Sequence, residues 1–133
     1  MKQSSTEPEY CFDLSWVEAK SPIAKKFLTE RSKLNGLVDA ADNKLLKRIY
    51  NVDHNAYLEG ALSAKTKELM GLVASASLRC DDCIYYHVIQ SFRLGCTRSE
   101  QEEAINVATV VGGTIVIPHL RRAYALLDEL YSE

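Results

Sequence analysis

The sequence lacks any long apolar run and any large excess of charge of one sign. No segment approaches the ~18 apolar residues that a membrane-spanning helix needs, and the first residues, MKQSSTEPEYCFDLSW, contain no apolar stretch typical of a signal peptide. Lys and Arg number 16 against 18 Asp and Glu, so no basic surface for nucleic acid is expected. These absences predict a cytoplasmic protein that binds neither membranes nor nucleic acid.

The chain has only four cysteines, too few for a disulfide-rich scaffold, and their placement matters more than their number. Four cysteines in a reducing compartment do not predict a structural disulfide framework. Cys80 and Cys83 form a Cys-x-x-Cys pair, which favours metal binding or catalysis. Cys11 and Cys96 have no partner in the sequence, and we interpret them as incidental thiols.

The length of 133 residues predicts a single domain, residues 1–133, in which residues 1–20 are an amino-terminal extension. Apolar residues recur at helical spacing throughout the rest, so the expected fold class is all-α with about six helices. These helices are expected over about residues 22–35, 39–58, 64–76, 81–94, 98–111 and 116–130.

Helix boundaries are marked by local signals. Ser21 is expected as an N-cap that precedes Pro22 at the first helical position, and Asn35-Gly36 as the stop of the same helix. Ser63 is expected to cap the third helix. Thr97 and Glu100 have the spacing of a capping box, and Gly95 is expected just after a helix carboxyl end. The β-branched run Thr114–Ile117 fits either a helix start or a short extended segment.

The candidate catalytic residues lie between Glu68 and His87, in the sequence ELMGLVASASLRCDDCIYYH. His87 follows Cys83 by four residues, so both lie on one face of a helix that begins near Cys80. The helix dipole at that end favours a thiolate. Glu68 reaches the same face only if the chain reverses near residues 77–79. A partly buried carboxylate can accept a proton near neutral pH, so a proton relay of Glu68, His87 and Cys83 is expected.

The pattern of Glu68, eleven residues, Cys80-x-x-Cys83, three residues and His87 resembles the alkylhydroperoxidase D-like branch of the carboxymuconolactone decarboxylase family. The specific match covers residues 65–95. The resemblance implies an all-helical homo-oligomer, commonly a trimer or hexamer, with the Cys pair at a helix amino terminus. It also implies a peroxidase or thiol–disulfide oxidoreductase whose electrons come from a dithiol donor, such as dihydrolipoamide or a thioredoxin-like protein.

By the same resemblance, Cys83 attacks a hydroperoxide or protein-disulfide substrate, Cys80 resolves the product to a disulfide, and Glu68 and His87 move protons. No cofactor is implied. One feature departs from some relatives, which carry a second His directly before the second Cys, because this chain has Asp81-Asp82 between its cysteines. Two carboxylates beside the thiols oppose thiolate formation unless they are held in the first turn and face solvent.

Two other functions fit the same residues. In a lactone-processing decarboxylase, Glu68 and His87 would do acid–base chemistry and the cysteines would be spectators. In a zinc-stabilised interaction module, Cys80, Cys83 and His87 would be ligands, although the second ligand pair of the usual zinc pattern is missing. His119 could line a pocket or an interface, and Tyr85 and Tyr86 are expected as packing or pocket walls. The run of tyrosines that includes Tyr57 is expected to serve helix packing.

Overall fold

The computed structural model describes residues 12–133, and these residues form helices joined by short turns. The elements in chain order are α1 (Ser15–Lys20), α2 (Pro22–Ala40), α3 (Lys44–Ala56), α4 (Ala64–Ser77), α5 (Asp81–Arg93), α6 (Arg98–Gly112), the 3₁₀ turn η1 (Thr114–Val116) and α7 (Ile117–Leu130). No β-strand occurs in this part of the chain, so the predicted all-α fold class is confirmed. No helix of residues 12–133 is both long and apolar enough to cross a membrane.

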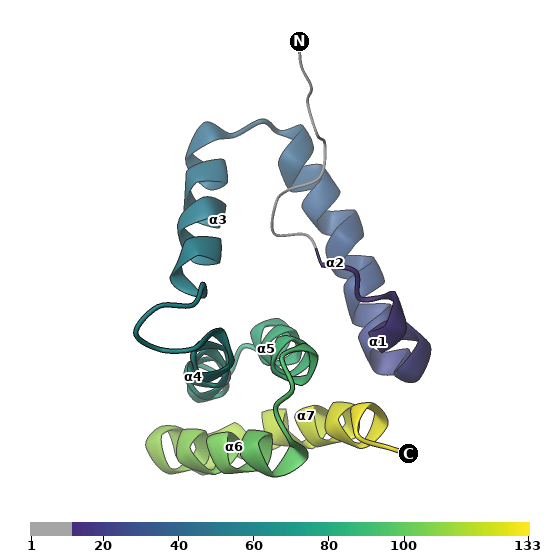
Figure 1. Ribbon diagram of the computed structural model, residues 1–133, viewed down its shortest axis with the longest axis vertical. Helices are drawn as coiled ribbons and strands as arrows, with labels where there is room; N and C mark the ends of the chain where they lie inside the picture. Colours follow the sequence, from purple (N-terminus) through teal and green to yellow (C-terminus); the bar gives the residue numbers. More distant parts are fainter. Residues whose placement is uncertain (1–11) are drawn as a thin grey trace.

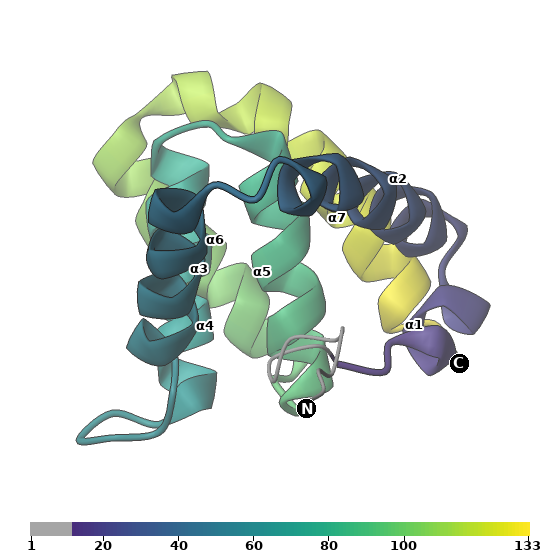
Figure 2. The same ribbon diagram turned by 90° about the horizontal axis from the view of Figure 1, so that it is seen from above.

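The core is formed mainly by α4, α5, α6 and α7. In Figure 1, α6 and α7 lie in one layer, α4 and α5 are seen nearly end-on above it, and α2 and α3 stand on the opposite side. Figure 2 shows the same arrangement from above, with α5 between the other helices. The largest completely buried apolar side chains belong to this core: Leu72, Ile84, Ile89, Ile105, Leu126, Leu127 and Leu130.

Several predicted boundary signals are confirmed. Ser21 caps α2 and accepts a hydrogen bond from the backbone N–H of Ala24, with Pro22 in the first turn. Ser63 caps α4 in the same way, and both halves of the predicted capping box are present at the start of α6. Gly95, with φ of 89°, follows α5 in the left-handed conformation that glycine adopts without steric conflict.

Other boundaries differ from the prediction. The helix that begins at Pro22 does not stop at Asn35-Gly36 but continues to Ala40, because a glycine inside an exposed helix costs only about 1 kcal/mol. The next helix is consequently shorter than expected, and Asn43 caps it. The run from Thr114 is a 3₁₀ turn that leads into α7, not an extended segment.

The segment expected as an extension contains a further helix, α1. Val17 of α1 is completely buried, and the ring of Trp16 stacks on Phe92 of α5 with centroids 5.4 Å apart. The start of α2 is tied to α7, because the Glu129 carboxylate accepts hydrogen bonds from Ser21 Oγ (2.6 Å) and from the Ile23 N–H (2.9 Å). These contacts fix α2 above α5.

The α3 helix is the least embedded element. None of its residues is buried, and its apolar side chains Leu45, Ile49 and Val52 are exposed. These three positions recur at helical spacing and share one face. Their exposure leaves an amphipathic helix without a covering layer in the single chain.

Close packing between α4 and α5 depends on Gly71. A Cβ atom at this position would lie only 2.6–2.9 Å from three ring atoms of His87, which is closer than non-bonded atoms approach. Gly71 is itself buried. The absence of a side chain therefore lets the His87 ring lie directly against the α4 backbone.

Gly71→Ala is expected to lower the free energy of unfolding by about 1–3 kcal/mol, because the new methyl group displaces a buried ring. Gly36→Ala is the matched control, since a Cβ at Gly36 meets nothing within 4 Å, and it should raise stability by about 0.5–1 kcal/mol. Urea denaturation measures both. Equal gains for the two variants would contradict the packing described.

Candidate active site

Cys80 and Cys83 lie at the amino terminus of α5, as predicted. Cys80 is the N-cap residue, and its Sγ accepts a hydrogen bond of 3.3 Å from the backbone N–H of Cys83. The two side chains form a disulfide, and their Cα atoms are 5.3 Å apart, within the usual range for such a bond. The structure thus holds the oxidised form of the pair.

The chain reverses direction between α4 and α5 at Arg79, within the predicted break at residues 77–79. Arg79 has φ of 61°, a left-handed conformation that costs a non-glycine residue about 1–2 kcal/mol. The Arg79 N–H bonds to the Ala76 carbonyl and the Cys80 N–H to the Ser75 carbonyl, which together form a Schellman motif. This turn ends α4 and leaves Cys80 in position to cap α5.

Glu68 and His87 meet across the interface between α4 and α5. Glu68 Oε2 and His87 Nδ1 are 2.8 Å apart, and the two residues are only 5% and 8% exposed. An ionised carboxylate only accepts hydrogen bonds, so Nδ1 donates and Nε2 of a neutral ring is left as an acceptor. The structure thus brings Glu68 to the helix that carries the cysteines, as the hairpin prediction required.

Tyr57 adjoins this pair. Its hydroxyl lies 3.5 Å from His87 Nε2, and the two rings are tilted against each other with centroids 5.4 Å apart. Burial, with the negative charge of Glu68, raises the pKa of Tyr57 above its usual value, and the same causes raise the pKa of Tyr86. Both phenols therefore stay protonated at neutral pH, and Tyr57 can donate to His87.

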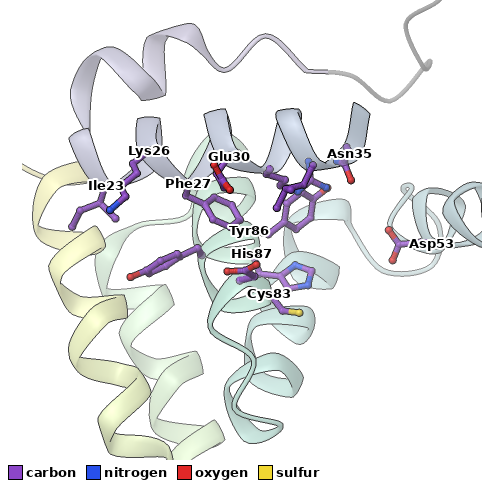
Figure 3. A pocket seen from close by; sticks show the side chains of 13 residues that line it. Ile23, Lys26, Phe27, Glu30, Asn35, Asp53, Cys83, Tyr86 and His87 are labelled. Atoms are coloured by element: carbon purple, nitrogen blue, oxygen red, sulfur yellow. The ribbon is translucent and has the colours of Figure 1, made fainter. Parts of the chain in front are cut away.

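A cavity of about 720 Å³ lies beside Cys83, between α2 and α5, with α3 at its edge (Figure 3). We call it the Cys83 cavity. Its lining combines aromatic and apolar side chains with a polar rim. It is formed by Ile23, Lys26, Phe27, Glu30, Arg31, Leu34, Asn35, Asp53, Asp82, Cys83, Tyr85, Tyr86 and His87.

Cys83 and His87 thus face one cavity, whereas Cys80 and Glu68 are not among its lining residues. Cys83 is exposed, and it is the cysteine of the pair that adjoins the cavity. The Arg31 guanidinium lies 4.5 Å from the ring centroid of Tyr86, and Phe27 contacts Tyr85 edge to face. Tyr85 and Tyr86 are therefore pocket walls, as expected.

The two aspartates between the cysteines have different surroundings. Asp82 is exposed and lines the Cys83 cavity. Asp81 instead contacts α7, where it is paired with His119 and Arg122. His119 does not line the Cys83 cavity. It instead connects α7 to the start of α5 through its contact with Asp81.

The remaining cysteines lie apart from this site or outside the described residues. Cys96 is buried near the carboxyl end of α5, and burial raises the pKa of its thiol, which is the state of an unreactive cysteine. Cys11 is outside residues 12–133. Within that range, no group of three or more His, Cys, Asp or Glu side chains is arranged to hold a metal ion.

Sequence reasoning missed Tyr57 as a neighbour of His87 and missed the contribution of α2 to the cavity. Tyr57 lies in the α3–α4 connection, and only the tertiary fold brings it to a histidine thirty residues away. Phe27 and Arg31 belong to a helix that resembles an ordinary amphipathic one. No local signal in the sequence marks these residues.

Solved structures with the same fold include members of a known family. The structure of TM1620 from Thermotoga maritima is 52% identical and superposes with a TM-score of 0.77, covering 80% of this chain and 93% of that one. A second structure of TM1620 (TM-score 0.75, 51% identity, 79% and 89% coverage) is described as a carboxymuconolactone decarboxylase family protein with a suggested part in the antioxidative response. Apo-lpg0406 from Legionella pneumophila, of the same family, shares the fold at 24% identity, with a TM-score of 0.70 and coverage of 83% and 96%.

Curated relatives are similar over most of the chain. A protein of Paracoccus denitrificans, uncharacterized protein 4 in the cox locus, is 31% identical over 109 residues, which are 82% of this chain and 92% of that protein. The uncharacterized protein H16_B0147 of Cupriavidus necator is 28% identical over 106 residues, or 80% and 94%. The family model for carboxymuconolactone decarboxylases matches residues 43–126. This chain therefore belongs to the carboxymuconolactone decarboxylase family.

Proposed function

We propose that the protein is a thiol-dependent oxidoreductase, a peroxidase or disulfide reductase that cycles between a Cys80/Cys83 dithiol and disulfide. The main observation behind this proposal is that the Cys80–Cys83 pair and the buried Glu68–His87 pair lie on the same helix hairpin. Cys83 opens onto a cavity that His87 also lines, and His87 is hydrogen-bonded to buried Glu68. The suggested antioxidative part of TM1620 is in keeping with this chemistry.

In the peroxidase form of the reaction, the Cys83 thiolate attacks the terminal oxygen of a hydroperoxide. A sulfur–oxygen bond forms, the O–O bond breaks, and the alcohol leaves with one proton. The Cys80 thiol then attacks the sulfenic sulfur of Cys83, which forms the disulfide and releases water. A dithiol donor reduces the disulfide and is itself oxidised, so electrons and atoms balance over the cycle.

The roles of Glu68 and His87 follow from their hydrogen bond. Glu68 fixes the His87 tautomer in which Nε2 is unprotonated. Nε2 can then accept the proton of the Cys83 thiol directly, through a water, or through the Tyr57 hydroxyl that lies 3.5 Å from it. The protonated ring then supplies a proton to the departing alkoxide. Because Glu68 is buried, its negative charge stabilises the imidazolium more strongly than an exposed carboxylate would.

Titration of the reduced protein with tert-butyl hydroperoxide should consume two thiols and form the Cys80–Cys83 disulfide, counted by mass spectrometry. Cys83→Ser should abolish this loss, and Cys96→Ser is the matched control that should leave it unchanged. If oxidised lipoamide, but no hydroperoxide, consumes the two thiols, the disulfide reductase form holds. No loss with either oxidant, or loss that survives Cys83→Ser, would overturn the proposal.

Glu68→Gln and His87→Ala should each slow thiol oxidation by about 100-fold, the usual contribution of a general acid–base group. Glu103→Gln, an exposed carboxylate change on α6, is the control and should leave the rate unchanged. Thermal denaturation accompanies the measurement, since His87→Ala leaves Glu68 buried without its partner. Full rates in both folded variants would show that the proton relay is wrong.

We also propose that the protein self-associates as a trimer or hexamer through the exposed apolar face of α3 formed by Leu45, Ile49 and Val52. Burial of this face between copies would remove apolar surface from water. Ile49→Lys should therefore yield smaller species in sedimentation velocity. Asn51→Lys places the same side chain on another face of α3 and should leave the assembly intact. A wild-type monomer at micromolar concentration would contradict this proposal.

A further inference from the structure

Asp81, directly after Cys80, is held by two side chains from α7. His119 Nδ1 is 2.8 Å from Asp81 Oδ1, and Arg122 Nη1 donates to Asp81 Oδ2 over 3.2 Å. Each carboxylate oxygen thus has its own partner. Asp81 follows Cys80 by one residue and precedes Cys83 by two, so these contacts connect α7 to the turn that carries the redox pair.

The helical spacing of α7 explains why two of its side chains contact the same carboxylate. His119 and Arg122 are three residues apart, so they lie on one face of the helix and reach the same carboxylate. Arg122 Nη1 also lies 3.5 Å from the Pro118 carbonyl oxygen. The His119, Asp81 and Arg122 side chains are 23%, 37% and 55% exposed. A partly exposed ion pair of this kind contributes little to folding stability, so its effect on neighbouring charges is the more important one.

The charge of Asp81 would otherwise oppose the chemistry of the cysteines. The amino end of α5 carries unpaired N–H groups and the positive end of the helix dipole, which favour a thiolate at Cys80 or Cys83. A carboxylate in the same turn disfavours that thiolate. Arg122 places a positive charge on this carboxylate and, with His119, directs it to α7, away from the Cys83 cavity that Asp82 lines.

We propose that Arg122 and His119 are positioning residues that set the redox poise of the Cys80–Cys83 pair by holding and compensating Asp81. This inference rests on the proposed thiol–disulfide function. It adds that residues of α7, outside the α4–α5 hairpin, influence the reduction potential of the pair. The affected equilibrium is the half-reaction in which the disulfide takes up two electrons and two protons to give the dithiol. Ionisation of one thiol stabilises the dithiol side, so a charge that favours the thiolate makes the pair more oxidising.

The test is the equilibrium between the protein and dithiothreitol at a single fixed pH, quantified by alkylation and mass spectrometry. Arg122→Gln should shift the equilibrium constant about threefold to tenfold towards the disulfide, equivalent to about 15–30 mV for a two-electron couple. Arg122→Lys keeps the charge and should stay close to wild type. Arg121→Gln removes the same charge from the neighbouring exposed position and is the matched control.

Asp81→Asn should shift the equilibrium in the opposite direction, and Asp81→Asn combined with Arg122→Gln should return it towards wild type. If Asp81 and Arg122 only supported the fold, the two single variants would not shift the redox equilibrium in opposite directions. An equilibrium unchanged in both single variants, or an equal shift in Arg121→Gln, would overturn the inference while leaving the proposed function intact. A wild-type pair that dithiothreitol does not reduce reversibly would overturn both.

Discussion

Glu68 and His87 are paired inside the interface between α4 and α5, where neither polar group could be buried alone at an acceptable free energy. Their hydrogen bond therefore requires the two helices to lie close together. Gly71 permits the approach, because any side chain there would meet the His87 ring. The left-handed turn at Arg79 reverses the chain between the helices. The same turn leaves Cys80 at the helix cap, so the redox pair and the proton-transfer pair are positioned by one packing arrangement.

Two helices, α2 and α7, contact the hairpin formed by α4 and α5. On one side, α2 provides the aromatic wall of the Cys83 cavity and is tied to α7 through Glu129. On the other side, α7 pairs with Asp81, one of the two aspartates between the cysteines, through His119 and Arg122. Of the disulfide-bonded pair, Cys83 is exposed and lines the cavity, whereas Cys80 is half-buried and does not line it.

Much of the fold could be predicted because its boundaries are encoded locally. The caps Ser21, Ser63 and Thr97 satisfy backbone groups within their own first turn, and Gly95 marks a helix end through its own conformation. Gly36 was misleading for the same local reason, since its helix penalty is small enough for a longer helix to continue through it. The helix α1 was missed because a six-residue helix has too few apolar positions to show a period.

The candidate site could be predicted only where one helix turn or a known pattern encodes it. The spacing of Cys80, Cys83 and His87 is a property of α5, and the spacing of Glu68 indicated the hairpin. Contacts between distant segments leave no such trace: the hydroxyl of Tyr57 near His87 and the hold of α7 on Asp81 depend on tertiary packing. Asp81 looked unfavourable for thiolate formation in the sequence because its partners, His119 and Arg122, lie 38 and 41 residues further along the chain.

The central claim is that the packing of α4 on α5 activates one thiol of the pair. The most direct measurement is the pH dependence of alkylation of Cys83 in the reduced protein, resolved from Cys80 and Cys96 by mass spectrometry. The account predicts an apparent pKa for Cys83 below the ~8.5 of a free cysteine, and an increase in that value when His87 is replaced by Ala. A Cys83 that titrates at or above the free value, with no change in His87→Ala, would contradict it.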